Sequence, residues 1–266
     1  MWGDSEVSER QRAAFAQRSF RVGLMVLAVG RYTHYLQHFL QSAETHFLPG
    51  LPVNYYILTD NPEKLIPPPE LGEERSLRVV PVAEMPGWEH LARRRMDLLA
   101  STIDNQVQQE VDYVFCADVD QEFASQVGTE ILGTLVARLD PQHTSMPIYT
   151  YPSERSPDSR ACVLDEEGDY YYTSELYGGL CSEVMALTKV CSQLILQDHA
   201  LGVEAQGLEE SYLNRYLIDR RPTCVLSPEY SWWDSPVTPE VPQKSVISLG
   251  RQCASLRDQG KSALNC

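Results

Sequence analysis

Two carboxylates, Asp118 and Asp120, stand two residues apart directly after an apolar stretch that ends at Ala117. Their placement around a turn lets both approach one hard divalent cation, directly or through water. The coordination positions that they leave open suit diphosphate oxygens, as in Mn²⁺ or Mg²⁺ sites. An Asp-x-Asp sequence also occurs as a plain acidic turn, but the strand in front of this one favours the metal site.

Other phosphate and metal motifs do not fit the sequence. Glu122 stands where the phosphatase pattern Asp-x-Asp-x-Thr/Val needs Thr or Val. Phe123 stands where a calcium-binding loop needs glycine for its sharp turn. A Gly-rich Walker loop and a Gly-x-Gly-x-x-Gly turn are absent as well. ATP hydrolysis and dinucleotide chemistry are therefore not indicated.

Apolar runs that alternate with amphipathic segments predict an α/β fold around this acidic pair. The predicted strands are 21–29, 53–59, 77–82, 111–117 and 224–226, and the predicted helices are 32–47, 93–105, 129–139, 182–196 and 209–218. This alternation is typical of an open, mainly parallel sheet flanked by helices. Ligands of such sheets bind at the carboxyl ends of the strands, which is where Asp118 falls.

The composition narrows the classes of ligand. A chain of 266 residues with 43% hydrophobic side chains can bury the core of one compact domain. The net charge of −15 argues against binding nucleic acid or an anionic membrane, because both need clustered Lys and Arg. We expect no membrane segment in this chain, because its longest apolar run, 22–29, is far shorter than the roughly 20 residues that span a bilayer.

The seven cysteines do not form a metal or redox motif, because none are spaced as Cys-x-x-Cys. Free cysteine is among the most buried residue types, so buried thiols are the first expectation and disulfides the alternative. The cysteines therefore assign the chain to neither an oxidising nor a reducing compartment.

Eight short segments between residues 21 and 257 keep a characteristic order and spacing. They are 27–32 (LAVGRY), 56–60 (YILTD), Trp88 with 94–96 (RRM), 115–120 (FCADVD), 167–172 (EGDYYY), 178–179 (GG), 210–214 (ESYLN) and 226–230 (LSPEY). Together they resemble the retaining α1,3-galactosyl and N-acetylgalactosaminyl transferases of glycosyltransferase family six, which includes the ABO blood-group and Forssman synthases.

The resemblance implies a GT-A type fold: a Rossmann-like, mainly parallel open sheet in a single catalytic domain. That domain would span 21–258, after an N-terminal extension 1–20 and before a C-terminal tail 259–266. It also implies an Mn²⁺-dependent hexosyltransferase that moves galactose or N-acetylgalactosamine from a UDP-sugar to a galactoside glycan or glycolipid in α1,3 linkage. Relatives in vertebrates work in the Golgi lumen, which is the expected location.

The resemblance also assigns roles to single residues. Leu27, Val29 and Tyr32 would line the uridine pocket, Arg94 would face the donor phosphates, and Asp118, Val119 and Asp120 would hold ribose and metal. Arg251 and Arg257, six residues apart, would close over the diphosphate, with a pair of solvated surface arginines as the alternative. Glu210 would lie beneath the anomeric carbon, as a nucleophile or as the stabiliser of an oxocarbenium ion. Taken alone, a glutamate there could simply favour a helix N-terminus.

The chain departs from the family pattern where sugars are recognised. Gly207 and Leu208 replace a Trp-His pair, and Glu209 replaces an aspartate that contacts the donor sugar. Residues 173–175 (TSE) stand where relatives choose between the two sugars, so Ser174 and Glu175 join the candidate donor site. Glu175 would bond sugar hydroxyls or crowd the 2-substituent, which favours UDP-galactose. Trp232 or Trp233 would offer a platform for a sugar face or pack in the core.

Two other functions compete with transfer. A catalytically silent relative that still binds UDP or glycans is suggested by the lost Trp-His pair. A glycoside hydrolase is disfavoured, because the paired aspartates and the basic tail suit a diphosphate leaving group better than a sugar.

Overall fold

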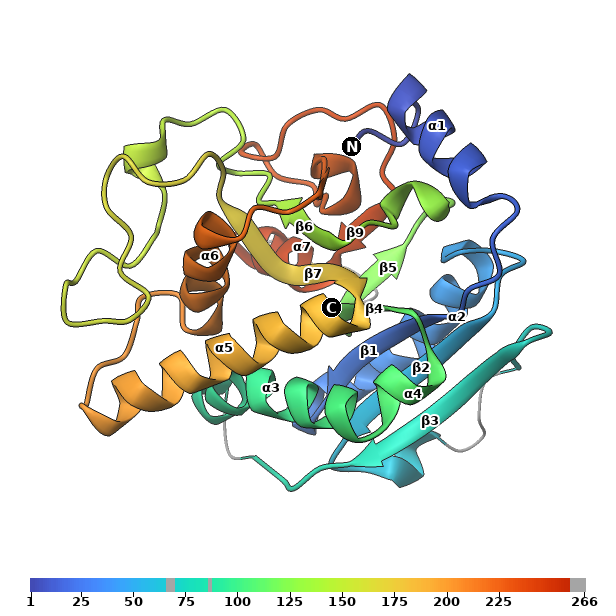
Figure 1. The fold of residues 1–266 in the computed structure, drawn as a ribbon, viewed down its shortest axis with the longest axis horizontal. Helices are drawn as coiled ribbons and strands as arrows, with labels where there is room; N and C mark the ends of the chain where they lie inside the picture. Colours follow the sequence, from blue (N-terminus) through green and yellow to red (C-terminus); the bar gives the residue numbers. More distant parts are fainter. Residues whose placement is uncertain (66–69, 86–87, 259–266) are drawn as a thin grey trace.

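Buried apolar strands form the central sheet. The computed structural model describes residues 1–65, 70–85 and 88–258, and these contain a seven-stranded sheet in the order β3-β2-β1-β4-β7-β6-β8 (Figure 1). The strands are β1 (Val22–Ala28), β2 (Val53–Thr59), β3 (Arg75–Pro81), β4 (Tyr113–Asp118), β6 (Leu135–Leu139), β7 (Tyr172–Leu180) and β8 (Cys224–Leu226). Only β7 runs antiparallel to its neighbours, so the sheet is mainly parallel, and the expected GT-A-like α/β fold is confirmed.

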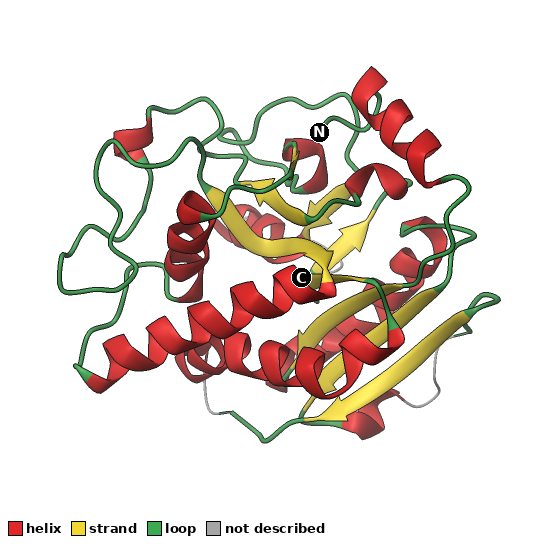
Figure 2. Ribbon diagram, in the orientation of Figure 1, coloured by secondary structure: helices red, strands yellow, loops and turns green. Residues whose placement is uncertain are grey.

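Helices cover both faces of the sheet (Figure 2). The α-helices are α1 (Glu6–Phe15), α2 (Leu36–His46), α3 (Trp88–Thr102), α4 (Gln108–Glu110), α5 (Cys181–Ala200), α6 (Glu209–Asp219) and α7 (Leu249–Asp258). Alternate residues of the buried strands face opposite sides. Leu24 and Val26 pack with Phe39 of α2, whereas Met25 packs with Met96 of α3 and helices α5 and α6. None of the described helices is long and apolar enough to cross a membrane.

Short elements connect these layers. They are the 3₁₀-helices η1 (Gly30–Tyr35), η2 (Pro62–Leu65), η4 (Thr129–Ile131), η5 (Ile148–Thr150) and η6 (Pro228–Tyr230), the π-helix η3 (Ile103–Val107), and the strands β5 (Gln121–Phe123) and β9 (Val246–Ser248). Strands β5 and β9 pair with each other in a small second sheet. This pairing brings the segment before α7 back to the end of β4.

Most predicted elements are confirmed. Strand 53–59 matches β2 at both ends, and strands 21–29, 77–82, 111–117 and 224–226 match β1, β3, β4 and β8. Helix 32–47 is present as η1 followed by α2, and helices 93–105, 182–196 and 209–218 correspond to α3, α5 and α6.

The predicted helix 129–139 is wrong. The structure has the short η4 there, then strand β6 between β7 and β8. An apolar run that is buried on both faces has no clear period, so a strand and a helix look alike in it.

The first residues dock onto the domain that follows them. Helix α1 begins after Ser5, whose side chain accepts a bond from the backbone of Ser8. Gly3 N donates to Glu229 Oε2 over 2.7 Å, and Arg12 pairs with the buried Glu130 at 3.0 Å. The segment that we expected as an N-terminal extension is thus held beside η4 and η6.

The cysteines whose side chains the structure describes are free. Cys116, Cys181, Cys191 and Cys224 are buried thiols and Cys162 is half-buried. Burial raises the pKa of the Cys224 thiol to about 11, so this group stays protonated and packs as an apolar side chain.

Candidate active site

The acidic pair lies where two parallel strands end. Leu27 at the end of β1 is in register with Asp118 at the end of β4. A cavity at this edge is lined by Leu27, Tyr32, Leu91, Arg95, Asp118, Val119 and Asp120. The structure thus brings together the predicted residues of β1, η1 and the acidic turn. Val29, also predicted for this pocket, is buried in the hydrophobic cluster beside Leu27.

A second cavity continues from the first, because Tyr32 and Asp120 line both. Its other walls are η1 and the start of α7, with Glu175 and Arg251 among the lining residues. The two hollows together can hold an extended ligand that passes Asp120.

Arg95 of α3 makes the main contact with the acidic pair. Its guanidinium group lies 2.6 Å from Asp118 Oδ1 and donates to Ser174 O at 3.3 Å. The expectation for Arg94 needs correction, because Arg94 is exposed and pairs with Asp97 on the same helix. Arg95 lies four residues before Leu99, on the face that already carries Met96, so helical spacing could have identified it.

The site has a surplus of negative charge. Six carboxylates and three guanidinium groups of the described residues meet here in buried or half-buried positions: Asp118, Asp120, Asp140, Glu175, Glu209 and Glu210 against Arg95, Arg138 and Arg251. Burial and then the charges of Asp118 and Glu175 raise the pKa of Asp120 to about 7. A divalent cation suits this donor set, because it would offset the surplus that repels a diphosphate.

Among the described residues no third metal-ligating side chain joins Asp118 and Asp120. A cation bound here would therefore take most of its ligands from the diphosphate and from water, which is the usual arrangement for Mg²⁺-like ions in nucleotide sites. Arg95 pairs with Oδ1 of Asp118 and so holds this carboxylate in place beside Asp120.

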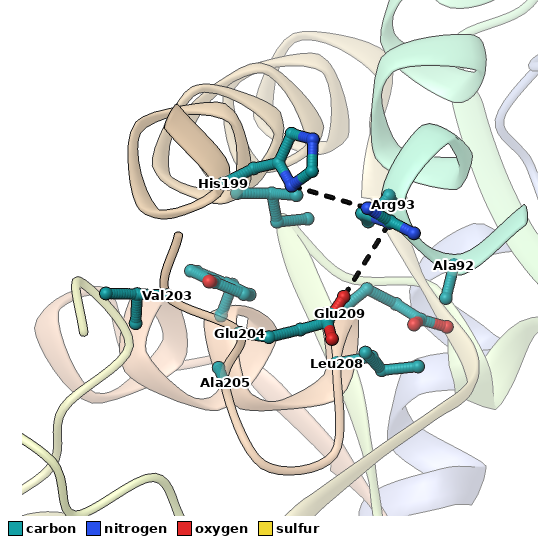
Figure 3. Close-up of a pocket in the computed structure, with 10 residues that line it drawn as sticks. Ala92, Arg93, His199, Val203, Glu204, Ala205, Leu208 and Glu209 are labelled. Carbon is teal, nitrogen blue, oxygen red and sulfur yellow. Dashed lines mark hydrogen bonds and ion pairs between the residues drawn. The ribbon is translucent and has the colours of Figure 1, made fainter. Parts of the chain in front are cut away.

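Glu209 lines a smaller pocket between α3, α5 and α6 (Figure 3). Its carboxylate extends toward α3 below Ala92, and Oε1 lies 3.5 Å from Arg95 Nη1. Burial raises the pKa of Glu209 to about 7, and the positive charge of Arg95 partly opposes this. Leu208 lines the smaller pocket rather than the cavities beside Asp120.

The mouth of this smaller pocket carries a polar bridge. Arg93 reaches His199 Nδ1 at 3.3 Å and Glu204 at 3.7 Å (Figure 3). The bridge ties α3 to the end of α5 and to the loop before α6, so it supports the position of Glu209.

Glu210 is held by three hydrogen bonds. Tyr171 Oη donates to Oε1 at 2.9 Å, and the backbone N–H and hydroxyl of Ser174 donate to Oε2 at 2.8 and 3.2 Å. Burial raises the pKa of Glu210, and the charge of Arg251 partly opposes the rise. Since Ser174 also accepts a bond from Arg95, one short chain of contacts joins Glu210 to Asp118.

Asn214 fixes this geometry from α6. Its side chain bonds both the N–H and the C=O of Tyr172, each at 2.8 Å, and so pins β7 to the helix that carries Glu210. We expect Asn214→Ala to lower the free energy of unfolding by about 3 kcal/mol, because two buried backbone groups lose their partners. Urea unfolding with an unchanged m-value would measure this loss. The exposed Asn61→Ala is the matched control, and equal midpoints for both variants would contradict the expectation.

Glu175 and Arg251 occupy the far end of the second cavity. Glu175 pairs with Arg138 Nη2 at 2.7 Å and with Arg251 Nε, while Arg251 Nη1 lies 3.0 Å from Asp140. Arg251 thus faces carboxylates, although the sequence predicted that it faces a diphosphate. The side chain of Arg257 lies outside the described part of the structure.

The aromatic pair has two different surroundings. Trp233 is buried and carries Arg251 over its ring at 4.8 Å, whereas Trp232 is half-buried under Lys244 at 3.5 Å. Packing against cations, rather than an open sugar platform, describes both rings.

Arg138 and Asp140 were not among the residues predicted for the site. Arg138 falls near the end of the predicted helix 129–139 and Asp140 directly follows it, so their approach to Glu175 could not be foreseen. The register of β6 beside β7, with Arg138 opposite Thr173, is what places them.

Known proteins match most of this chain. Residues 4–253 match the sequence profile described as "Glycosyltransferase family 6". The globoside alpha-1,3-N-acetylgalactosaminyltransferase 1 of Gallus gallus is 40% identical over 242 residues, which cover 91% of this chain and 70% of that protein. Its Homo sapiens counterpart is 42% identical over 89% of this chain and 68% of that protein. The Homo sapiens alpha-1,3-galactosyltransferase 2 is 35% identical over 87% of this chain and 68% of its own length.

Proposed function

The chain belongs to glycosyltransferase family 6 and is a hexosyltransferase, and on this premise we propose its reaction and ligands. It moves galactose or N-acetylgalactosamine from a UDP-sugar to a galactoside acceptor in α1,3 linkage, with retention of the anomeric configuration. The observation that carries the proposal is the chain of contacts from Asp118 through Arg95 and Ser174 to Glu210. It links the aspartate pair of the first cavity, which we propose as the metal ligands, to a carboxylate that three hydrogen bonds hold in place.

Different residues would bind different parts of the donor. Leu27 and Tyr32 bind the uridine, and Asp118 with Asp120 would hold Mn²⁺, which supplies positive charge against the diphosphate leaving group. Arg95 keeps Asp118 in place and adds its own positive charge.

Glu210 serves the reacting carbon. The bond from the anomeric carbon to the phosphate oxygen breaks, the acceptor oxygen bonds to the same face, and the hydroxyl proton passes to the departing diphosphate. Glu210 either forms a transient ester with the anomeric carbon or stabilises its positive charge from the opposite face. Tyr171 and Ser174 aim the carboxylate in both cases.

The donor and the compartment are part of the proposal. The buried Glu175 leaves less room beside the sugar than a small residue would, which favours UDP-galactose over its bulkier N-acetyl analogue. The family resemblance supports the Golgi lumen as the compartment.

A second candidate is a UDP-binding relative without turnover. Glu175 and Arg251 line the second cavity and pair with each other, which leaves less space there for a donor sugar and favours this alternative. Both candidates predict UDP binding, so binding alone does not separate them.

One experiment tests the proposal. A panel of UDP-sugars is incubated with galactoside acceptors and Mn²⁺, and the product linkage is determined by NMR. An α1,3-linked product supports the transferase, a β-linked product contradicts retention, and UDP binding with no turnover of any donor supports the silent relative.

A further inference from the structure

Four charged side chains form an alternating network at the end of the second cavity. In order they are Arg138 of β6, Glu175 of β7, Arg251 of α7 and Asp140, which directly follows β6. The proposed chemistry uses Arg251 only if its guanidinium group can reach the diphosphate. In the structure that group is paired with two carboxylates instead.

The two arginines of the network differ in how firmly they are held. The Arg138 side chain is fully buried and donates to Tyr230 O as well as to Glu175. The Arg251 side chain keeps 27% of its surface exposed and lines the cavity that Asp120 also lines. Arg251 is therefore the member that can turn toward a ligand while Arg138 stays in place.

Both carboxylates keep partners if Arg251 leaves. Glu175 retains Arg138 and the hydroxyls of Ser231 and Ser248, which donate at 3.3 and 3.2 Å. Asp140 retains the N–H of Gln142 at 2.8 Å and His143 at 3.2 Å. An unpaired buried charge would make such a move costly, and this arrangement avoids it.

The start of α7 lies directly on Asp120. The N–H groups of Leu249 and Gly250 donate to Asp120 O at 2.9 and 3.3 Å. A Cβ at Gly250 would lie 2.1 Å from Asp120 Oδ2, so a larger residue there would displace the Asp120 carboxylate. The same turn that covers the proposed metal ligand thus delivers Arg251 to Glu175 and Asp140.

We propose that Arg251 exchanges counter-ions when the donor binds. In the free protein it pairs with Glu175 and Asp140 and holds α7 against Asp120, and in the complex it turns to the donor diphosphate. Glu175 and Asp140 are positioning residues that compete with the diphosphate for Arg251 and set the affinity for the nucleotide. The inference rests on the proposed function, because it requires a nucleotide diphosphate beside Asp120.

The test measures UDP affinity by calorimetry with Mn²⁺ in the full chain. Asp140→Asn is expected to tighten UDP binding about fivefold, because one competitor for Arg251 loses its charge. Arg251→Met is expected to weaken it about tenfold, because a charged hydrogen-bond donor to the diphosphate is lost. In the double variant the gain from Asp140→Asn should vanish, since the gain acts through Arg251. The exposed Asp165→Asn is the control and should leave UDP affinity unchanged.

A second readout follows α7 itself. Amide hydrogen exchange of residues 249–258 without UDP should be faster in Asp140→Asn than in the wild type, and UDP with Mn²⁺ should restore protection. A merely structural role of Asp140 would weaken UDP binding rather than tighten it. If the wild type binds UDP but Asp140→Asn changes neither UDP affinity nor amide hydrogen exchange, the proposed counter-ion exchange of Arg251 is wrong, and the proposed function stands. Absence of UDP binding to the wild type contradicts the proposed function, and with it the counter-ion exchange of Arg251.

Discussion

Replacement of Glu210 by glutamine is expected to lower the turnover of the UDP-sugar about 10³-fold, which corresponds to about 4 kcal/mol of transition-state stabilisation. Glutamine has the same shape and can still accept the bonds from Ser174. It lacks the negative charge that a positively charged anomeric carbon needs in a site of low polarity. The affinity for UDP should stay within about twofold, because Glu210 does not line the cavity proposed for the uridine, and Ser174 and Arg95 lie between it and Asp118.

Steady-state transfer kinetics and UDP calorimetry on the same preparation separate these two effects. Glu166→Gln is the matched control, since Glu166 is exposed. Full turnover in Glu210→Gln would remove Glu210 from the mechanism. A parallel loss of UDP binding and of thermal stability would instead show that Glu210 serves the fold.

The strands that lead to Asp118 could be predicted because burial leaves a clear pattern there. β1, β2 and β4 are short apolar runs that end at turn residues, and their parallel pairing follows from the helices between them. Once these strands were placed, Asp118 had to lie at the carboxyl edge. The position of the acidic pair followed from local sequence and general topology.

Strand β7 and its contacts could not be predicted in the same way. β7 is buried along nearly its whole length, yet it carries Thr173, Ser174 and Glu175 in sequence. Such a polar stretch contradicts the usual pattern of a central strand. It is stable because Arg138, Arg95 and the residues around Glu210 satisfy it, and those contacts span more than thirty residues of sequence. Because these charge pairs join residues that are far apart in the sequence, they leave no periodic pattern in the local sequence.

Arg94 and Arg95 are neighbours in the sequence but point in different directions from α3. Neighbouring residues of an α-helix point about 100° apart, because 3.6 residues complete a turn. That rotation places Arg95 against Asp118 and Arg94 in solvent. Three consecutive arginines, 93 to 95, look equivalent in composition, and only their phase relative to Leu99 distinguishes them.

Replacement of Asp120 by asparagine is expected to abolish the Mn²⁺-dependent part of UDP binding and to reduce transfer by about 10³-fold or more. An amide oxygen is a weaker ligand for a hard cation than a carboxylate, and only Asp118 would remain beside it. Without the cation, the surplus of carboxylates around the cavity would repel the diphosphate. UDP calorimetry with and without Mn²⁺ measures the loss, with Asp97→Asn, whose side chain is 47% exposed, as control.

The same variant should be more stable, and this opposite sign makes the prediction specific. Burial and the charges of Asp118 and Glu175 raise the pKa of Asp120 to about 7, so its ionised form is strained in the metal-free protein. Asparagine removes that repulsion, and thermal unfolding should reveal a gain of about 1 kcal/mol, the size typical of relieving a strained functional group. A variant that lost both stability and UDP binding would point to a structural aspartate. If Asp120 is a metal ligand held beside other carboxylates for its function, the variant should lose Mn²⁺-dependent UDP binding and have a higher melting temperature.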